Sequence, residues 1–148
     1  MNNFNFKFVT DTSTLCVFDL ECLKHRLDDD VDWWSIPSDE LSEVNNGNVA
    51  FLGLGGDGEF VVKLVESIDN PKVRTNLKVP SGKVFIGAGE EVTADELEPE
   101  CVRGGSFVDL KAGNYVLLAR FENGVIELAF ESCTEEKNYF KDLLRLVD

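Results

Sequence analysis

The sequence has few basic residues for its length. Its 148 residues contain 14 Lys and Arg against 28 Asp and Glu, which gives a formal net charge of −14. Binding to nucleic acids or to anionic membranes requires Lys and Arg that displace counterions from phosphates, so this charge disfavours both kinds of partner. The chain also lacks any apolar run near the roughly 20 residues that a membrane span requires. We therefore predict no nucleic-acid and no membrane partner.

Residues of the types that hold metals or act as nucleophiles are also few. The four cysteines show no C-x-x-C spacing and the only histidine is His25, so a zinc site is not expected. No G-x-S-x-G motif of a serine hydrolase occurs. Cys22 and His25 are three residues apart, a spacing that on a helix would suit a thiolate–imidazole pair, but we interpret His25 as a surface residue. The sequence therefore predicts no catalytic residue, no metal and no cofactor.

The cysteines and the N-terminus indicate a compartment. Residues 1–7 lack the apolar segment of a signal peptide. Cysteines without a disulfide-type spacing are typical of a reducing environment. We interpret Cys16, which lies in an apolar run, and Cys133, which follows an expected strand, as small core or near-core residues. We expect a cytoplasmic protein with reduced thiols.

Two short patterns resemble functional motifs. Residues 53–58 fit G-x-G-x-x-G after an expected strand, as in a dinucleotide-binding loop. The chain lacks the βαβ alternation of such folds, so we interpret these residues as a hairpin turn that binds no dinucleotide. Three aspartates in the segment 28–32 match positions 1, 3 and 5 of a calcium-binding loop, but Trp33 stands where that loop requires Gly. We interpret this segment as a solvated loop.

Runs of β-branched and aromatic residues, separated by Gly, Asn and Pro, predict a protein rich in strands. Asn123-Gly124 is the strongest local signal, because Asn and Gly tolerate the positive φ of a type I′ hairpin turn. It predicts antiparallel pairing of residues 115–121 with residues 125–130. The expected strands are 4–8, 14–18, 49–54, 60–65, 73–79, 83–86, 106–110, 115–121 and 125–130.

Helical spacing is confined to three segments. Asp19 is an expected N-cap for a short helix through His25, and Ser38 for a second helix to about Val44. Apolar residues recur at helical spacing after Thr134, which predicts a closing helix packed on the sheet. We therefore predict a single acidic α+β domain over residues 1–148, mainly antiparallel β-sheet, with short helices in the N-terminal half and a C-terminal helix.

One segment is strongly acidic. No Lys or Arg occurs from Val84 to Val102, a pattern that indicates a solvated or partner-facing surface. The only tryptophans, Trp33 and Trp34, are adjacent in a polar segment, and exposed Trp is a frequent anchor of protein interfaces. We expect the two tryptophans and six carboxylates to contact a protein partner. The carboxylates are Glu90, Glu91, Asp95, Glu96, Glu98 and Glu100.

Two segments of the chain resemble small bacterial proteins that are grouped as a family of unknown function. The first is Arg26-Leu27-Asp28-Asp29 with the downstream Trp pair, and the second runs from Val79 to Thr93, VPSGKVFIGAGEEVT. The resemblance spans most of the chain and implies no activity, because such a family has none assigned. At the level of class alone, a compact acidic domain is also similar to bacterial immunity proteins that neutralise basic toxins.

The sequence thus favours a non-catalytic, acidic protein-binding module, an immunity-type or inhibitory partner of a basic protein. The alternative is a small-ligand or carbohydrate-processing protein that uses carboxylates in a β-lined pocket. An apolar pocket that contains carboxylates of raised pKa would favour the alternative, and a flat acidic face beside an exposed Trp would favour the module.

Overall fold

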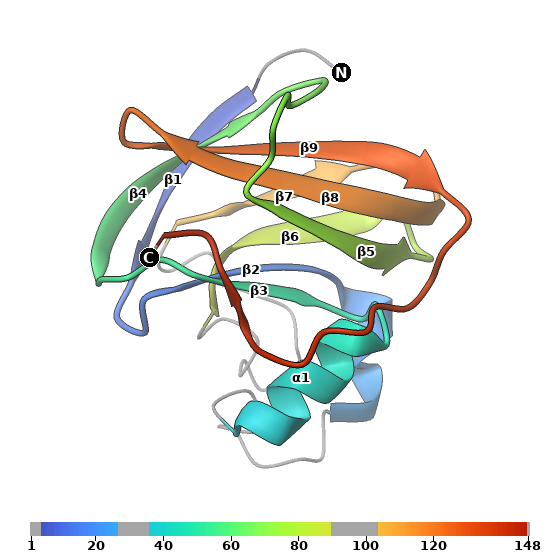
Figure 1. Cartoon of the computed structure of the whole chain (residues 1–148). Helices are drawn as coiled ribbons and strands as arrows, with labels where there is room; N and C mark the ends of the chain where they lie inside the picture. Colours follow the sequence, from blue (N-terminus) through green and yellow to red (C-terminus); the bar gives the residue numbers. More distant parts are fainter. Residues whose placement is uncertain (1–3, 27–35, 90–103, 148) are drawn as a thin grey trace.

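The computed structural model describes residues 4–26, 36–89 and 104–147, apart from the side chains of His25 and Arg26 (Figure 1). The strands in this part of the chain are β1 Phe4–Thr10, β2 Thr14–Asp19, β3 Ala50–Gly53, β4 Gly58–Leu64, β5 Val73–Val79, β6 Lys83–Ala88, β7 Ser106–Asp109, β8 Gly113–Glu122, β9 Val125–Cys133 and β10 Leu144–Arg145. They form two five-stranded sheets that face each other, with the orders β1-β4-β9-β8-β5 and β10-β3-β2-β6-β7.

The main core lies between the two sheets. Side chains alternate between the two faces of a strand, so each strand sends every second residue into this space. Leu15 and Val17 of β2 belong to the same buried cluster as Leu117 and Ala119 of β8. Burial of this apolar surface is the main favourable contribution to folding.

Strand β2 is buried on both faces, which explains its nearly continuous apolar sequence. Its other face, with Cys16 and Phe18, joins a second cluster that includes Val44 and Phe85. The rings of Phe18 and Phe85 meet edge to face, with centroids 5.9 Å apart. The interpretation of Cys16 as a core residue is confirmed, since its side chain is fully buried.

Two short helices cover the outer face of the second sheet. The first, η1 (Leu20–Arg26), is a 3-10 helix, and the second, α1 (Pro37–Asn45), is an α-helix. The expectation that Ser38 caps the second helix is wrong. Ile36 occupies the cap without a side-chain hydrogen bond, and Pro37 begins the first turn, where a missing N–H costs nothing. No helix in the described ranges is long and apolar enough to cross a membrane.

The expected β-hairpin is confirmed. Strands β8 and β9 pair antiparallel from Asn114 with Cys133 to Glu122 with Val125. Asn123 and Gly124 connect them with φ values of 54° and 79°. Both residues thus adopt the positive φ that a type I′ turn requires.

The predicted fold class is wrong in its helical part. The protein is a two-sheet β-sandwich with short helices, and the described C-terminal residues, 134–147, form no helix. Leu144 and Arg145 instead form β10, which pairs parallel with β3, and the N–H groups of Leu146 and Val147 donate to the carbonyl of Gly53. The apolar residues after Thr134 are therefore spaced along an extended segment, whose backbone bonds to other elements.

The interpretation of residues 53–58 as a hairpin turn is also wrong. They connect β3 in one sheet to β4 in the other, so the two flanking strands do not pair. Leu54 N donates to Ser13 O (2.7 Å), and Ser13 Oγ donates to Asp57 Oδ1 (2.7 Å). A strand follows this connection, whereas a dinucleotide fingerprint requires a helix.

Candidate functional site

The residues predicted to contact a partner lie outside the part of the chain that the structure describes. This holds for Trp33 and Trp34 and for the acidic segment with Glu90, Glu91, Asp95, Glu96, Glu98 and Glu100. The aspartates that match a calcium-binding loop, Asp28, Asp30 and Asp32, also lie outside the described residues.

A C-terminal strap, residues 134–147, crosses α1 and ends beside β3 (Figure 1). Asparagine side chains hold it in place. The amide of Asn138 is buried, donates to the carbonyls of Val44 (2.8 Å) and Asn76 (3.0 Å), and accepts from Asn76 N (2.7 Å). The amide of Asn45 donates to Phe140 O (3.0 Å) and accepts from Phe140 N (2.8 Å). These bonds take the place of the regular backbone hydrogen bonds that a helix or strand would supply.

The strap also approaches the backbone after α1 very closely. Gly47 has a φ of +74°, and a Cβ at this position would overlap the carbonyl of Glu136. Only glycine satisfies both conditions without strain. The path of the strap is thus determined by Asn138, Asn45 and this glycine.

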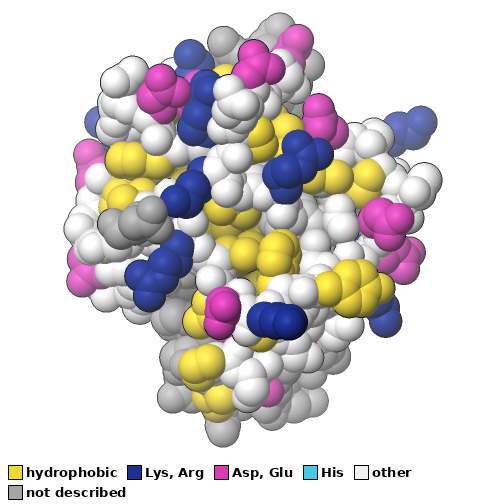
Figure 2. All heavy atoms as spheres, in the orientation of Figure 1, with side chains coloured by type: hydrophobic (Ala, Val, Ile, Leu, Met, Phe, Trp, Pro, Cys, Tyr) yellow, Lys and Arg dark blue, Asp and Glu magenta, His cyan; other side chains and the backbone are white. Residues whose placement is uncertain are grey.

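Between two of these anchors the strap exposes an aromatic ring. Tyr139 is 86% exposed, although the adjacent Asn138 is buried and Phe140 packs against the second core cluster. Leu143 of the strap and Ile36, the N-cap residue of α1, are also more than two-fifths exposed. Figure 2 shows hydrophobic side chains at the surface in the lower part of the molecule, where the strap crosses α1, interspersed with charged ones. A ring held on a fixed backbone loses little entropy on binding, which is typical of an interface anchor.

One cleft beside the strap contains a buried carboxylate, Glu40 of α1. The cleft has a volume of about 330 Å³ and lies between the start of β2, the end of β3, α1 and β10; its lining includes Ser13, Thr14, Phe51, Leu144 and Arg145. Glu40 is only 9% exposed. Burial raises the pKa of its carboxyl from 4.5 to about 7. A small-ligand pocket is expected to contain more than one carboxylate of raised pKa. This cleft supplies one such carboxylate, Glu40.

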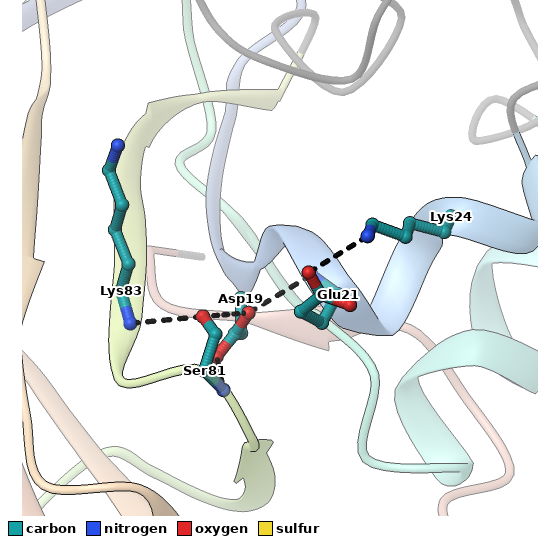
Figure 3. Close-up of polar contacts among 5 residues, drawn as sticks. All are labelled: Asp19, Glu21, Lys24, Ser81 and Lys83. Atoms are coloured by element: carbon teal, nitrogen blue, oxygen red, sulfur yellow. Dashed lines mark hydrogen bonds and ion pairs between the residues drawn. The ribbon is translucent and has the colours of Figure 1, made fainter.

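A second buried carboxylate, Asp19, has a different environment (Figure 3). Its Oδ1 accepts from Glu21 N (3.0 Å) and from the hydroxyl of Ser81 (2.7 Å), and its Oδ2 accepts from Ser81 N (2.8 Å). Asp19 thereby joins the start of η1 to the turn between β5 and β6. The expected capping role of Asp19 is confirmed by the bond from Glu21 N. Because its oxygens are occupied, Asp19 is a structural residue.

A larger cleft of about 450 Å³ contains Cys22 and is lined also by Glu21, Asn48, Lys78 and Glu136. The thiol of Cys22 donates to Lys78 O (3.5 Å). Burial, and then the negative charge of Asp19, raises the pKa of this thiol to about 11. A thiol with this pKa is protonated at neutral pH, so the environment of Cys22 does not support a thiolate nucleophile.

Sequence reasoning missed Asn138, Tyr139 and Glu40. Asn138 acts over a separation of 94 residues from Val44, so no local pattern indicates it. Glu40 lies with Glu43 and Val44 on the buried side of α1, and a carboxylate at such a position is not what hydropathy predicts. Nothing in the sequence distinguishes Tyr139, because the predicted C-terminal helix gives no reason to expect an exposed ring at this position.

Comparison with known proteins gives one family and two similar structures. A model of the Family of unknown function (DUF6386) matches residues 1–146. The structure described as Crocagin biosynthetic gene J is 15% identical, with a TM-score of 0.50 over 87% of this chain and 98% of that chain. ComJ from Bacillus subtilis, an inhibitor of the DNA degrading activity of NucA, is 11% identical, with a TM-score of 0.52 over 90% and 96%. No curated protein sequence matches. At these identities the structures show a shared fold.

Proposed function

We propose a function for this chain, which belongs to the Family of unknown function (DUF6386): it is a non-catalytic, acidic module that binds and inhibits a basic protein. ComJ, which has a similar fold, inhibits an enzyme that degrades DNA. An enzyme that acts on DNA needs a cationic surface for the phosphates, and an acidic protein competes for such a surface. We propose a partner of this type, located with the module in the cytoplasm.

The distribution of charge carries this proposal. Residues 27–35 contain four acids and no base, and residues 90–103 contain six acids and one arginine. These two segments contribute −4 and −5, and thus −9 of the net −14. They coincide with the predicted contact residues, which are the Trp33-Trp34 pair and the six carboxylates between Glu90 and Glu100. We propose that the carboxylates accelerate association and that a tryptophan supplies contact area that slows dissociation.

The test begins with capture of a partner from the cytosol of the source cell, followed by measurement of its association and dissociation rates across a salt series. Glu96, Glu98 and Glu100 changed together to Gln are expected to slow association and to flatten its salt dependence. Trp34→Ala is expected to speed dissociation. A matched control neutralises three exposed acids elsewhere, Asp109, Glu131 and Glu135.

The control should leave the association rate nearly unchanged, because its three charges lie on β7, on β9 and on the strap, outside the proposed contact segments. Equal effects of the two triple variants would mean that only net charge matters, which would contradict the proposed contact segment. Association that is fast at low salt in both variants would contradict the role of charge altogether. A captured protein without a basic surface would contradict the proposed partner.

The alternative function, a small-ligand or carbohydrate-processing protein, is favoured by one observation, the raised pKa of Glu40 in its cleft. Glycoside hydrolysis requires two carboxylates that flank the scissile bond. Among the described residues that line this cleft, Glu40 is the single carboxylate. We therefore favour binding over catalysis.

A further inference from the structure

Glu40 is a largely buried acidic residue whose carboxylate has no compensating group among the described residues. Its side chain accepts no hydrogen bond and forms no ion pair in the described ranges, although the residue is nine-tenths buried. Arg145 lines the same cleft from β10 but forms no ion pair with Glu40 there. Buried charges in folded proteins are normally paired, and a charge left unpaired is a candidate for ligand binding.

The walls of the cleft suit an aliphatic chain. Phe51 of β3 and Leu143 and Leu144 of the strap line it together with Glu40. Leu143 is 42% exposed, so apolar surface extends from the cleft to its rim. Ile36, also exposed, lies one helical turn before Glu40, and its carbonyl accepts the backbone N–H of Glu40 (2.9 Å). The cleft thus combines an apolar wall with the negative charge of Glu40, and Arg145 adds one positive charge to its lining.

We infer that this cleft receives a lysine side chain of the partner, with the ammonium group against the Glu40 carboxylate and the four-carbon stem against Phe51 and Leu144. This inference rests on the proposed function, because it needs a basic partner. Lysine carries a compact charge on a flexible apolar stem, which matches one carboxylate at the end of an apolar wall. Arginine is less well suited, since its planar group favours bidentate pairing with more acceptors.

The lysine also explains why an unpaired carboxylate is tolerable at this position. In the free protein the raised pKa allows Glu40 to be partly protonated near neutral pH, which reduces the cost of burial. An entering ammonium group favours the ionised form instead, and the two charges then pair away from water.

The direct test uses Nα-acetyl-lysine amide as the probe and records the NMR signals of the protein during titration. We expect saturable shifts at Glu40, Phe51 and Leu144. Nα-acetyl-norleucine amide has the same stem without the ammonium group and should bind at least ten-fold more weakly. Nα-acetyl-arginine amide should also bind more weakly than the lysine probe, and equal or tighter binding of it would overturn the assignment to lysine.

Three variants separate the carboxylate from general effects of charge. Glu40→Gln keeps the shape of the side chain and should raise the dissociation constant of the lysine probe at least ten-fold. Asp39→Asn removes one charge from the adjacent position of the same helix and should change it less than two-fold. Arg145→Ala removes a positive charge from the cleft and should tighten binding. Equal effects of Glu40→Gln and Asp39→Asn would overturn the inference.

The same variants distinguish this inference from the proposed function. If a basic partner is captured and Glu40→Gln leaves its dissociation rate unchanged, the partner stands and the lysine site is overturned. If the probe binds at Glu40 but the protein captures no partner, the proposed function fails and the partner's lysine is excluded as the occupant. Support requires that Glu40→Gln weakens both the probe and the partner.

Discussion

Asp19 and Glu40 are both buried carboxylates, 0% and 9% exposed, but only Asp19 has its oxygens occupied by donors. Asp19 accepts bonds from the backbone N–H groups of Glu21 and Ser81 and from the Ser81 hydroxyl. Glu40 lines a cleft and has no such donors among the described residues. The comparison separates two roles of a buried charge: with partners it connects elements of the fold, and without partners it is available to a ligand.

The largest expected effect is loss of stability on removing Asp19. Asp19→Ala leaves three donors at Ser81 and Glu21 without their acceptor, and we expect the free energy of unfolding to fall by about 3–5 kcal/mol. Urea unfolding followed by circular dichroism measures this change. Asp19→Asn retains one carbonyl oxygen and should lose less. A fall of less than about 1 kcal/mol for Asp19→Ala would contradict the assigned structural role.

Asn138 extends the comparison to the C-terminal strap. Asn138→Ala removes three hydrogen bonds, to Val44 and Asn76, and should lower the free energy of unfolding by about 2–3 kcal/mol. Hydrogen exchange at Leu146 and Val147 should become faster, because the strap is then held less firmly. The adjacent Tyr139→Ala provides the control. Tyr139 is exposed, so its removal should change stability by less than about 0.5 kcal/mol.

Glu40→Gln should raise the free energy of unfolding, whereas Asp19→Ala should lower it. The pKa of Glu40 is about 7 in the folded protein against an ordinary 4.5, so the folded state binds this proton more tightly. Its burial therefore costs little at low pH, and the cost grows as the pH rises from 4.5 to about 7. Glu40→Gln removes that cost, and we expect the variant to be more stable than the wild type by about 1–2 kcal/mol at high pH.

The measurement is urea unfolding of both proteins at pH 4.5 and at pH 8. Titration of the other groups cancels in the difference between variant and wild type, so only the contribution of Glu40 remains. The stability difference should nearly vanish at the lower pH. A difference that is independent of pH, or a variant that is less stable at pH 8, would show that the Glu40 carboxylate is compensated in the free protein.

How far apart in the sequence two interacting residues lie decides what the sequence could predict. The β8–β9 hairpin was predictable because Asn123 and Gly124 determine it within the turn itself. The sequence also predicted most strands, since their apolar runs are local features. The strap was not predictable, because Asn45 and Asn138 bond to residues about 60 to 95 positions away.

The candidate site was less accessible to sequence reasoning than the fold. Glu40 is one of 28 acids in the sequence, and it lies in a short polar segment. Only the packed fold places it on the buried side of α1. Residues 53–58 show the same difficulty, since their glycines indicate a turn but do not indicate that the chain changes sheets there. Local conformational preferences define the connection, and long-range packing defines its destination.

The smallest expected effect concerns a second polar group without a partner, the hydroxyl of Thr75. Thr75 is 1% exposed on β5, and its Oγ1 has no hydrogen-bond partner among the residues that the structure describes. Valine has the same shape without the hydroxyl, so Thr75→Val should raise the free energy of unfolding by about 0.5–1 kcal/mol at all pH values, unlike Glu40→Gln. Urea unfolding at two pH values distinguishes the two variants. Thr75→Ser is the control, since it keeps the hydroxyl, loses a buried methyl group and should destabilise by about 1 kcal/mol. If Thr75→Val destabilises the protein instead, the Thr75 hydroxyl has a hydrogen-bond partner. The absence of a visible hydrogen bond would then not show that a buried group is unsatisfied, and the contrast between Glu40 and Asp19 would lose its basis.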